Sequence, residues 1–133
     1  MKTNFICPKC SGYLLVGDKI IFTAKTKKDK RSGIILLSPK LGDYTSVLHS
    51  DFKIEKGEEV NFFCPICHAS LVVSDVDEKL VKIIMIDENS DKYEIYFSGV
   101  AGEHCTYKVS DEKIEKYGEA SEKYYKYFIG RRI

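Results

Sequence analysis

The 133-residue sequence contains no tryptophan, no marked excess of either charge and no apolar run near the roughly 18 residues of a membrane span. Its 21 basic and 20 acidic residues leave a formal net charge of +1. That balance argues against an overall electrostatic attraction to nucleic acid or to an anionic membrane. The first residues also lack the apolar segment of a secretory signal, so we expect no membrane association and a cytoplasmic location.

The motifs of common catalytic sites are absent as well. There is no glycine-rich phosphate loop, no H-E-x-x-H and no G-x-S-x-G. His104 and Cys105 invite a nucleophile hypothesis, but neighbours on a strand point to opposite faces. Because free cysteine is usually buried, we expect Cys105 to lie in the core. The sequence therefore favours a protein that is not an enzyme.

The other four cysteines lie in two matching segments. Residues 5–18 read FICPKCSGYLLVGD, and residues 62–75 read FFCPICHASLVVSD. Both segments contain Cys-Pro-x-Cys at the same place, and leucine and aspartate follow in the same register. Two copies are too few for a solenoid, but they suit two similar loops that face each other across a shared ion.

Two cysteines separated by two residues can bind one ion from a single turn, which proline stiffens. One pair leaves a tetrahedral ion half coordinated, whereas two pairs complete it. In a reducing compartment, cysteines are also better explained as ligands than as disulfides. We therefore predict one structural Zn²⁺, with Fe as the alternative because a tetrahedron of thiolates suits both metals, at Cys7, Cys10, Cys64 and Cys67.

Each Cys-Pro-x-Cys segment resembles the knuckle of the zinc-ribbon superfamily, and it is also similar to a rubredoxin knuckle. The resemblance covers only residues 5–18 and 62–75. Two features depart from it. The segment between the pairs is longer than the linker of a compact ribbon, and the glycine that commonly follows the second cysteine is displaced at Ser11-Gly12 and missing at His68-Ala69. The chain is then a ribbon-like site with a large β insertion, or a distinct β domain that uses the same knuckles.

Two other uses of the cysteine pairs were weighed. Cys64 to His68 matches the C-x-x-C-H pattern of c-type haem attachment, but the first copy carries Ser11 in place of the histidine. A thioredoxin-like redox pair expects a helix after the motif, whereas strands are predicted after both copies. Both uses are less favoured than a shared metal.

Branched and aromatic residues predict a mainly β, β-rich α+β fold with an antiparallel sheet. We expect a single domain of residues 1–133, with a β-rich metal-binding part at 1–109. Asp87–Asp91 and Glu55–Glu58 are predicted turns. The predicted strands, beyond the short ones flanking each cysteine pair, are Ile20–Ala24, Gly33–Ser38, Val60–Phe63, Leu80–Ile86, Tyr93–Ser98 and Thr106–Val109.

Residues 110–133 are predicted to form a helical tail. Ser110 is a suitable N-cap, Asp111 and Glu112 suit a first turn, and apolar residues recur at helical spacing from Ile114 to Phe128. Gly118 divides the pattern, so two short helices are an alternative. The aromatic residues of the tail are expected to dock on the sheet.

The closed metal site and the missing catalytic set favour a non-enzymatic zinc-binding domain that acts as a protein-binding or adaptor module. One alternative is a nucleic-acid-binding zinc ribbon whose basic loop contacts phosphates. Neutral overall charge and the absence of aromatics within that loop argue against it. A second alternative is a rubredoxin-like iron redox protein or a thiol enzyme using Cys105. The candidate nucleic-acid contacts are Lys25, Lys27, Lys28, Lys30 and Arg31.

Overall fold

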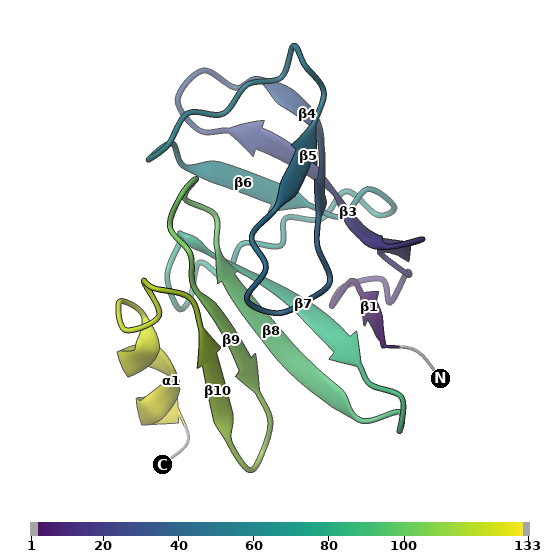
Figure 1. The fold of residues 1–133 in the computed structure, drawn as a ribbon, viewed down its shortest axis with the longest axis vertical. Coiled ribbons are helices and arrows are strands. Elements are labelled where there is room, and N and C mark those ends of the chain that lie inside the picture. The colour runs from purple at the N-terminus through teal and green to yellow at the C-terminus, as the bar shows by residue number, and fades with distance from the viewer. Residues whose placement is uncertain (1–2, 132–133) are drawn as a thin grey trace.

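A computed structural model describes residues 3–131 of the chain, and it is β-rich, as predicted. Two antiparallel sheets pack against each other, and a single short helix closes the described part of the chain (Figure 1).

The N-terminal sheet is an antiparallel meander in which β3 is central. β4 pairs with one edge of β3, while β2 and β6 share its other edge, at Lys19–Ile20 and at Thr23–Thr26. β5 completes the sheet beside β4. Its strands are β2 (Leu15–Val16), β3 (Lys19–Thr26), β4 (Ser32–Leu37), β5 (Ser46–Leu48) and β6 (Val60–Phe63).

The C-terminal sheet has the order β1-β7-β8-β9-β10, and all of its pairs are antiparallel. The predicted turn at Asp87–Asp91 joins β7 to β8, where the Asp91 carbonyl accepts a hydrogen bond from the Asp87 N–H. The strands of the C-terminal sheet are β1 (Asn4–Ile6), β7 (Leu80–Ile86), β8 (Lys92–Ser98), β9 (Thr106–Val109) and β10 (Ile114–Tyr117).

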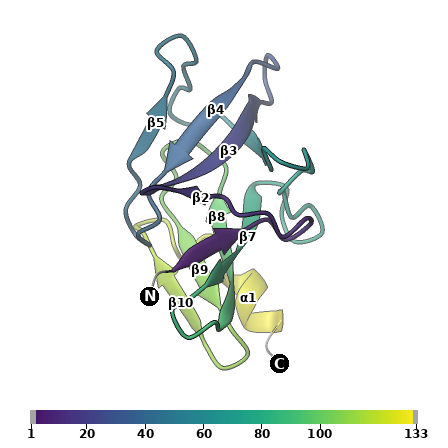
Figure 2. The ribbon, with the colours of Figure 1, turned by 90° about the vertical axis from the view of Figure 1, so that its right-hand side faces the viewer.

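The strand that leads into each cysteine pair is paired with a strand from the other half of the chain. β1 precedes the first pair but pairs with β7, which follows the second pair. β6 precedes the second pair but pairs with β3, which follows the first pair. Each half of the chain, residues 3–59 and 60–131, thus contributes one strand to the sheet of the other half. This exchange places both cysteine loops together at one side of the molecule (Figure 2).

Two apolar cores fill the molecule. The main core lies between the sheets, where alternate side chains of β3 are buried from Ile20 to Thr26. The second core lies on the outer face of the C-terminal sheet, under α1 (Tyr125–Arg131). There the Phe128 ring lies 4.8 Å from the ring of Tyr96 and 4.5 Å from that of Tyr107. The expected docking of the aromatic tail on the sheet is thus confirmed.

The prediction of a helical tail from residue 110 is wrong for its first part. Ile114–Tyr117 forms β10, since β9 offers an open edge whose backbone hydrogen bonds outweigh a helical pattern of side chains. Ser110 stabilises the β9–β10 turn, where its hydroxyl accepts the N–H groups of Glu112 and Lys113. Gly118 then turns the chain at φ 97°, and the helix begins only at Tyr125. Residues 132–133 lie outside the described part.

The sequence also left β5 unpredicted, because its three residues carry little pattern. Among residues 3–131, no helix has the length and apolar character needed to cross a membrane.

Candidate metal centre

The two cysteine loops have the same backbone hydrogen bonds. In the first, the Cys7 N–H donates to the Gly12 carbonyl over 3.0 Å, and the Ser11 N–H donates to the Cys7 carbonyl over 2.9 Å. In the second loop, the corresponding bonds join Cys64 to Ala69 over 3.0 Å and His68 to Cys64 over 2.9 Å. The repeat in sequence is therefore a repeat in structure, and we call the two loops, residues 7–12 and 64–69, the knuckles.

The residue after the second cysteine has a left-handed backbone in both knuckles. Ser11 has φ 61° and His68 has φ 65°. Glycine is the usual residue in this region, because a Cβ there crowds the following carbonyl. Ser11 and His68 thus stand where a knuckle commonly has glycine, and both adopt the same strained backbone conformation.

Gly12 has a different role from the glycine of a knuckle turn. A Cβ at this position would lie 2.5 Å from Cδ1 of Ile66, which belongs to the other knuckle. Gly12 therefore lies against Ile66 of the other knuckle, whose half-exposed side chain would have to turn to make room for a Cβ.

Backbone N–H groups point at the cysteine sulfurs within each knuckle. Cys7 Sγ accepts from the N–H of Lys9 at 3.3 Å and from that of Cys10 at 3.5 Å. Cys64 Sγ accepts from Ile66 and Cys67 at the same two distances. These N–H groups place partial positive charge against sulfur, which favours thiolate over thiol.

The four sulfur atoms form one compact cluster in which all lie within 4.8 Å of one another. Cys7 Sγ lies 3.8 Å from Cys67 Sγ, and Cys10 Sγ lies 3.8 Å from Cys64 Sγ. A tetrahedron with metal–sulfur bonds of about 2.3 Å has sulfur–sulfur edges of about 3.8 Å. The predicted meeting of the four thiol groups is confirmed, and their spacing fits one tetrahedral ion.

Each knuckle has one buried and one exposed cysteine. Cys7 and Cys64 are buried, and Cys10 and Cys67 are exposed. Burial raises the pKa of the Cys7 thiol to about 12. Burial also acts to raise the pKa of Cys64, but the N–H groups of Cys67 and Ile66 outweigh it, so that pKa is lowered. The closely spaced thiols thus differ in acidity, and a cation that bound all four would displace their protons.

Haem attachment and thioredoxin-like chemistry both fit this arrangement poorly. A haem would need the sulfurs of Cys64 and Cys67, which lie instead against those of the first knuckle. The second knuckle leads into turns and an isolated bridge at Val72, where a thioredoxin-like site would begin a helix.

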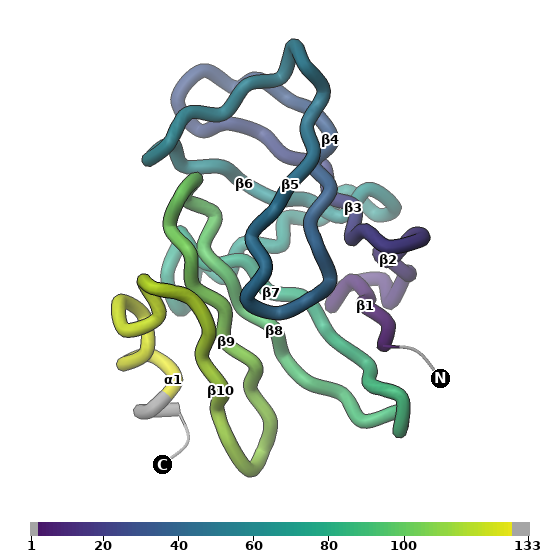
Figure 3. The backbone as a smooth tube through the Cα atoms, in the orientation of Figure 1, coloured from purple at the N-terminus to yellow at the C-terminus, as the bar shows by residue number. Residues whose placement is uncertain are grey.

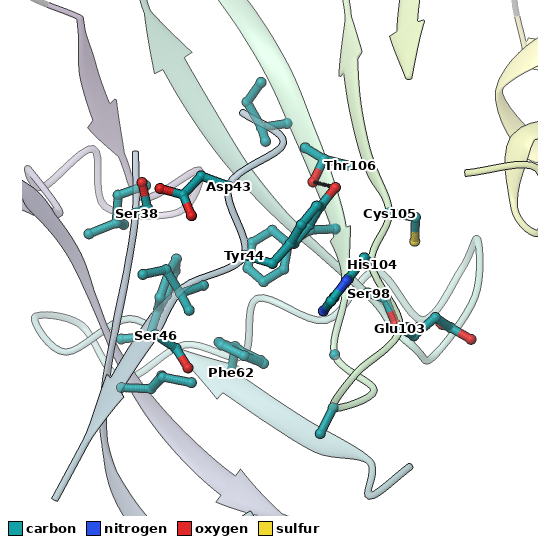
Figure 4. A pocket seen from close by; sticks show the side chains of 18 of the residues that line it. Ser38, Asp43, Tyr44, Ser46, Phe62, Ser98, Glu103, His104, Cys105 and Thr106 are labelled. Atoms are coloured by element: carbon teal, nitrogen blue, oxygen red, sulfur yellow. Dashed lines mark hydrogen bonds between the residues drawn. The ribbon is translucent and has the colours of Figure 1, made fainter. Parts of the chain in front are cut away.

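His104 and Cys105 are not arranged as a base and its nucleophile. Cys105 is buried in the second core, as expected, and this burial raises its pKa to about 11. The His104 ring instead stacks on Tyr44 at 4.6 Å, and its Nδ1 lies 2.8 Å from a Glu119 oxygen. Figure 4 shows the two side chains turned to different sides of the chain.

The predicted basic loop, residues 25–31, begins inside β3, to which Lys25 belongs, so only residues 27–31 form the connection between β3 and β4. Acidic residues neutralise part of its charge. Lys27 pairs with Glu59 at 3.1 Å, and Arg31 pairs with Asp29 at 2.7 Å and with Glu58 at 3.1 Å. For the other three cations of the loop, Lys25, Lys28 and Lys30, no ion pair is seen within residues 3–131.

Sequence reasoning missed two polar anchors. The Glu103 carboxylate accepts hydrogen bonds from Ser98, Lys123 and Tyr124 at 2.5–2.6 Å, and these bonds hold the C-terminal segment on its sheet. Tyr44 joins the β4–β5 connection to the C-terminal sheet. Neither residue has a local pattern, because the partners are distant in sequence.

Comparison with protein-family models, with curated proteins and with solved structures gives no match to this chain. The resemblance to zinc-ribbon knuckles therefore stays a prediction from the two Cys-Pro-x-Cys segments.

Proposed function

We propose that one zinc ion, bound by the four cysteines of the knuckles, is a structural element of this protein. The clustering of the four sulfurs within 4.8 Å carries the proposal, together with the two distances of 3.8 Å that match the edge of a tetrahedron. A site with four thiolates has no open position for substrate or water, so we propose a non-enzymatic role for the ion. Because each half supplies one knuckle, the ion would tie the two halves together.

We further propose that the folded chain acts as a protein-binding or adaptor module through its knuckle face. This surface consists of Tyr13, Val16 and Ile66, which are 66%, 59% and 55% exposed. All three lie within residues 5–18 and 62–75, and Ile66 contacts the first knuckle at Gly12. Large apolar side chains left exposed on these two segments favour a protein contact.

The identity of the metal can be tested on purified protein. Zinc with four thiolates gives a colourless protein, because its filled d shell has no visible transitions. A red protein with iron as the main metal would contradict the zinc proposal and favour the rubredoxin-like alternative.

The adaptor proposal can be tested with matched surface variants. A variant with Tyr13→Ser and Ile66→Ser should lose a partner that the wild type retains in a pull-down, while its zinc content stays unchanged. The control carries Ile34→Ser and Val47→Ser, two exposed apolar residues on the N-terminal sheet. If both variants retain the same partners as the wild type, the knuckle face is not the contact surface.

Nucleic-acid binding through the basic loop is less well supported than protein binding. The ion pairs of Lys27 and Arg31 reduce the charge that the loop could present to phosphates. A binding assay on mixed DNA and RNA at low salt tests this alternative, and a salt-dependent shift would favour it.

A further inference from the structure

A cavity of about 230 Å³ lies between the two sheets, away from the sulfur cluster. Inward-facing apolar side chains of both sheets line it, including Phe22 and Ile35 of the N-terminal sheet and Ile83 and Phe97 of the C-terminal sheet. An apolar cavity of about 150 Å³ can stay free of water and bind benzene. The larger space here is suitable for a molecule with about ten non-hydrogen atoms.

Three phenylalanine rings form an aromatic wall of the cavity. The Phe62 ring lies edge-on to Phe22, with centroids 5.4 Å apart, and edge-on to Phe97 at 5.3 Å. Phe22 and Phe97 lie 5.7 Å apart with their planes tilted. Edges and faces of aromatic rings attract one another, so a further ring can extend this arrangement.

The β4–β5 connection, residues 38–45, reaches from the N-terminal sheet toward the C-terminal sheet and returns to β5 (Figure 3), and its residues 38–44 line the cavity. Its Tyr44 hydroxyl donates to the Tyr117 carbonyl over 3.2 Å. The same oxygen lies 2.9 Å from the Thr106 hydroxyl, which then acts as the donor, and the Tyr44 ring stacks on His104 (Figure 4). Tyr44 thus fastens this connection, which we call the strap, to the C-terminal sheet.

Three of the four charged groups along the cavity have partners on the protein, and the fourth, Lys40, is exposed to solvent. Asp43 accepts hydrogen bonds from both the N–H and the hydroxyl of Thr45. Glu103 is bound to Lys123, and His104 to Glu119. A charged group placed deep among the apolar side chains, away from the exposed Lys40, would lack a counter-ion, which is costly.

From the aromatic wall, the cavity volume and the paired charges, we propose that this cavity binds a small uncharged aromatic molecule beneath the strap of Tyr44. None of the four knuckle cysteines lines this site, and the proposal goes beyond the adaptor role. With about ten atoms buried, the Kd of such a ligand should lie between about 1 mM and 10 µM.

The test uses 2-naphthol as the probe, titrated into the zinc-loaded full chain and followed by amide chemical shifts. We expect saturable shifts at Tyr44, Phe62 and Phe97 and none in the knuckles. Contacts from the probe to the rings of Phe62 and Phe97 in nuclear Overhauser spectra would place it in the cavity. Decanoate serves as the charged comparison and should bind at least about tenfold more weakly.

Two neighbouring residues of β5 offer a matched pair of variants. Leu48 lines the cavity, whereas Val47 faces solvent on the other side of the strand. Leu48→Trp should fill the space and weaken 2-naphthol binding about tenfold or more, and Val47→Trp should leave it unchanged. Absence of saturable binding to the wild type, equal binding of decanoate, or equal loss in both variants would overturn the proposal. If Leu48→Trp fails to fold, the nuclear Overhauser contacts of 2-naphthol in the wild type decide the question. Contacts to the rings of Phe62 and Phe97 support the proposal, and their absence overturns it.

Discussion

The two halves of the chain build the same knuckle but support their sheets differently. The outer face of the C-terminal sheet carries a second core, in which Tyr96 and Tyr107 pack under α1. The outer face of the N-terminal sheet leaves Ile34 and Val47 exposed. The conformation of a knuckle thus follows from its own short sequence. The stability of each half depends on whether further side chains cover the outer face of its sheet.

The exchange of leading strands limits how independent the halves can be. β3 needs β6 from the second half, and β7 needs β1 from the first. An ion shared by both knuckles would act at the same crossing point. The second core should therefore strengthen one half, while loss of the ion should affect both.

The largest expected effect comes from the buried cysteine of each knuckle. Cys7→Ser and Cys64→Ser should both lose zinc and unfold largely, because structural zinc contributes about 10 kcal/mol or more in small zinc domains and a whole domain is stable by only about 5–15 kcal/mol. Circular dichroism and elemental analysis measure both effects. A folded variant that retains zinc, or a large difference between the two variants, would contradict the equivalence of the knuckles.

Removal of the second core should be severe but selective. Phe128→Ala deletes a ring that is fully buried between Tyr96 and Tyr107, so we expect a loss of about 3–5 kcal/mol in the free energy of unfolding. Urea denaturation measures this loss, and zinc content should remain that of the wild type. If zinc is lost together with the helix, the second core and the knuckles are not separate supports.

Glu103 should give the C-terminal half a stability that depends on pH. Burial acts to raise the pKa of this carboxyl, but the hydrogen bonds from Lys123, Ser98 and Tyr124 outweigh it, and the pKa lies below the ordinary 4.5. The ionised form is thus stabilised by folding, so the contribution is complete above pH 4.5 and is lost as the pH falls through the lowered pKa.

The variant Glu103→Gln should therefore be less stable than the wild type by about 1–3 kcal/mol at pH 7, with the difference shrinking in acid. Urea denaturation at pH 7 and at pH 3 tests this. Glu119→Gln is the control, because Glu119 is an exposed carboxylate paired with His104, and it should change stability little. A constant difference between Glu103→Gln and wild type at both pH values would show that the carboxylate charge is not responsible.

The smallest expected effect tests the local equivalence of the knuckles. Ser11→Gly and His68→Gly remove a Cβ from a left-handed position, so each should stabilise the protein, by up to about 1 kcal/mol. Thermal unfolding of the zinc-loaded protein measures the gain. Gains of opposite sign would mean that the two turns are not under the same strain.

Much of the fold was predictable because its patterns are local. Val60–Phe63, Leu80–Ile86 and Thr106–Val109 carry branched and aromatic residues, and the structure places strands at these same residues. Ile114–Tyr117 was not predictable in this way, because its strand depends on the open edge of β9, which no local pattern describes.

The four cysteines of the candidate site could be predicted from the sequence, but the strand pairing that brings them together could not. The paired Cys-Pro-x-Cys segments indicated which sulfurs would meet. The crossing of β1 and β6 that brings them together depends on pairing between distant strands. The cavity beneath Tyr44 likewise depends on contacts to Thr106 and Tyr117 across the two halves.

The most direct test of the shared ion is the metal content of the purified chain, measured by native mass spectrometry together with elemental analysis. We predict one zinc ion per chain in the wild type and in Cys105→Ala, which leaves the knuckles intact, and none in Cys64→Ser. A chain that is folded without metal, that holds mainly iron, or that holds one zinc ion per two chains would contradict a structural zinc ion shared by the two knuckles.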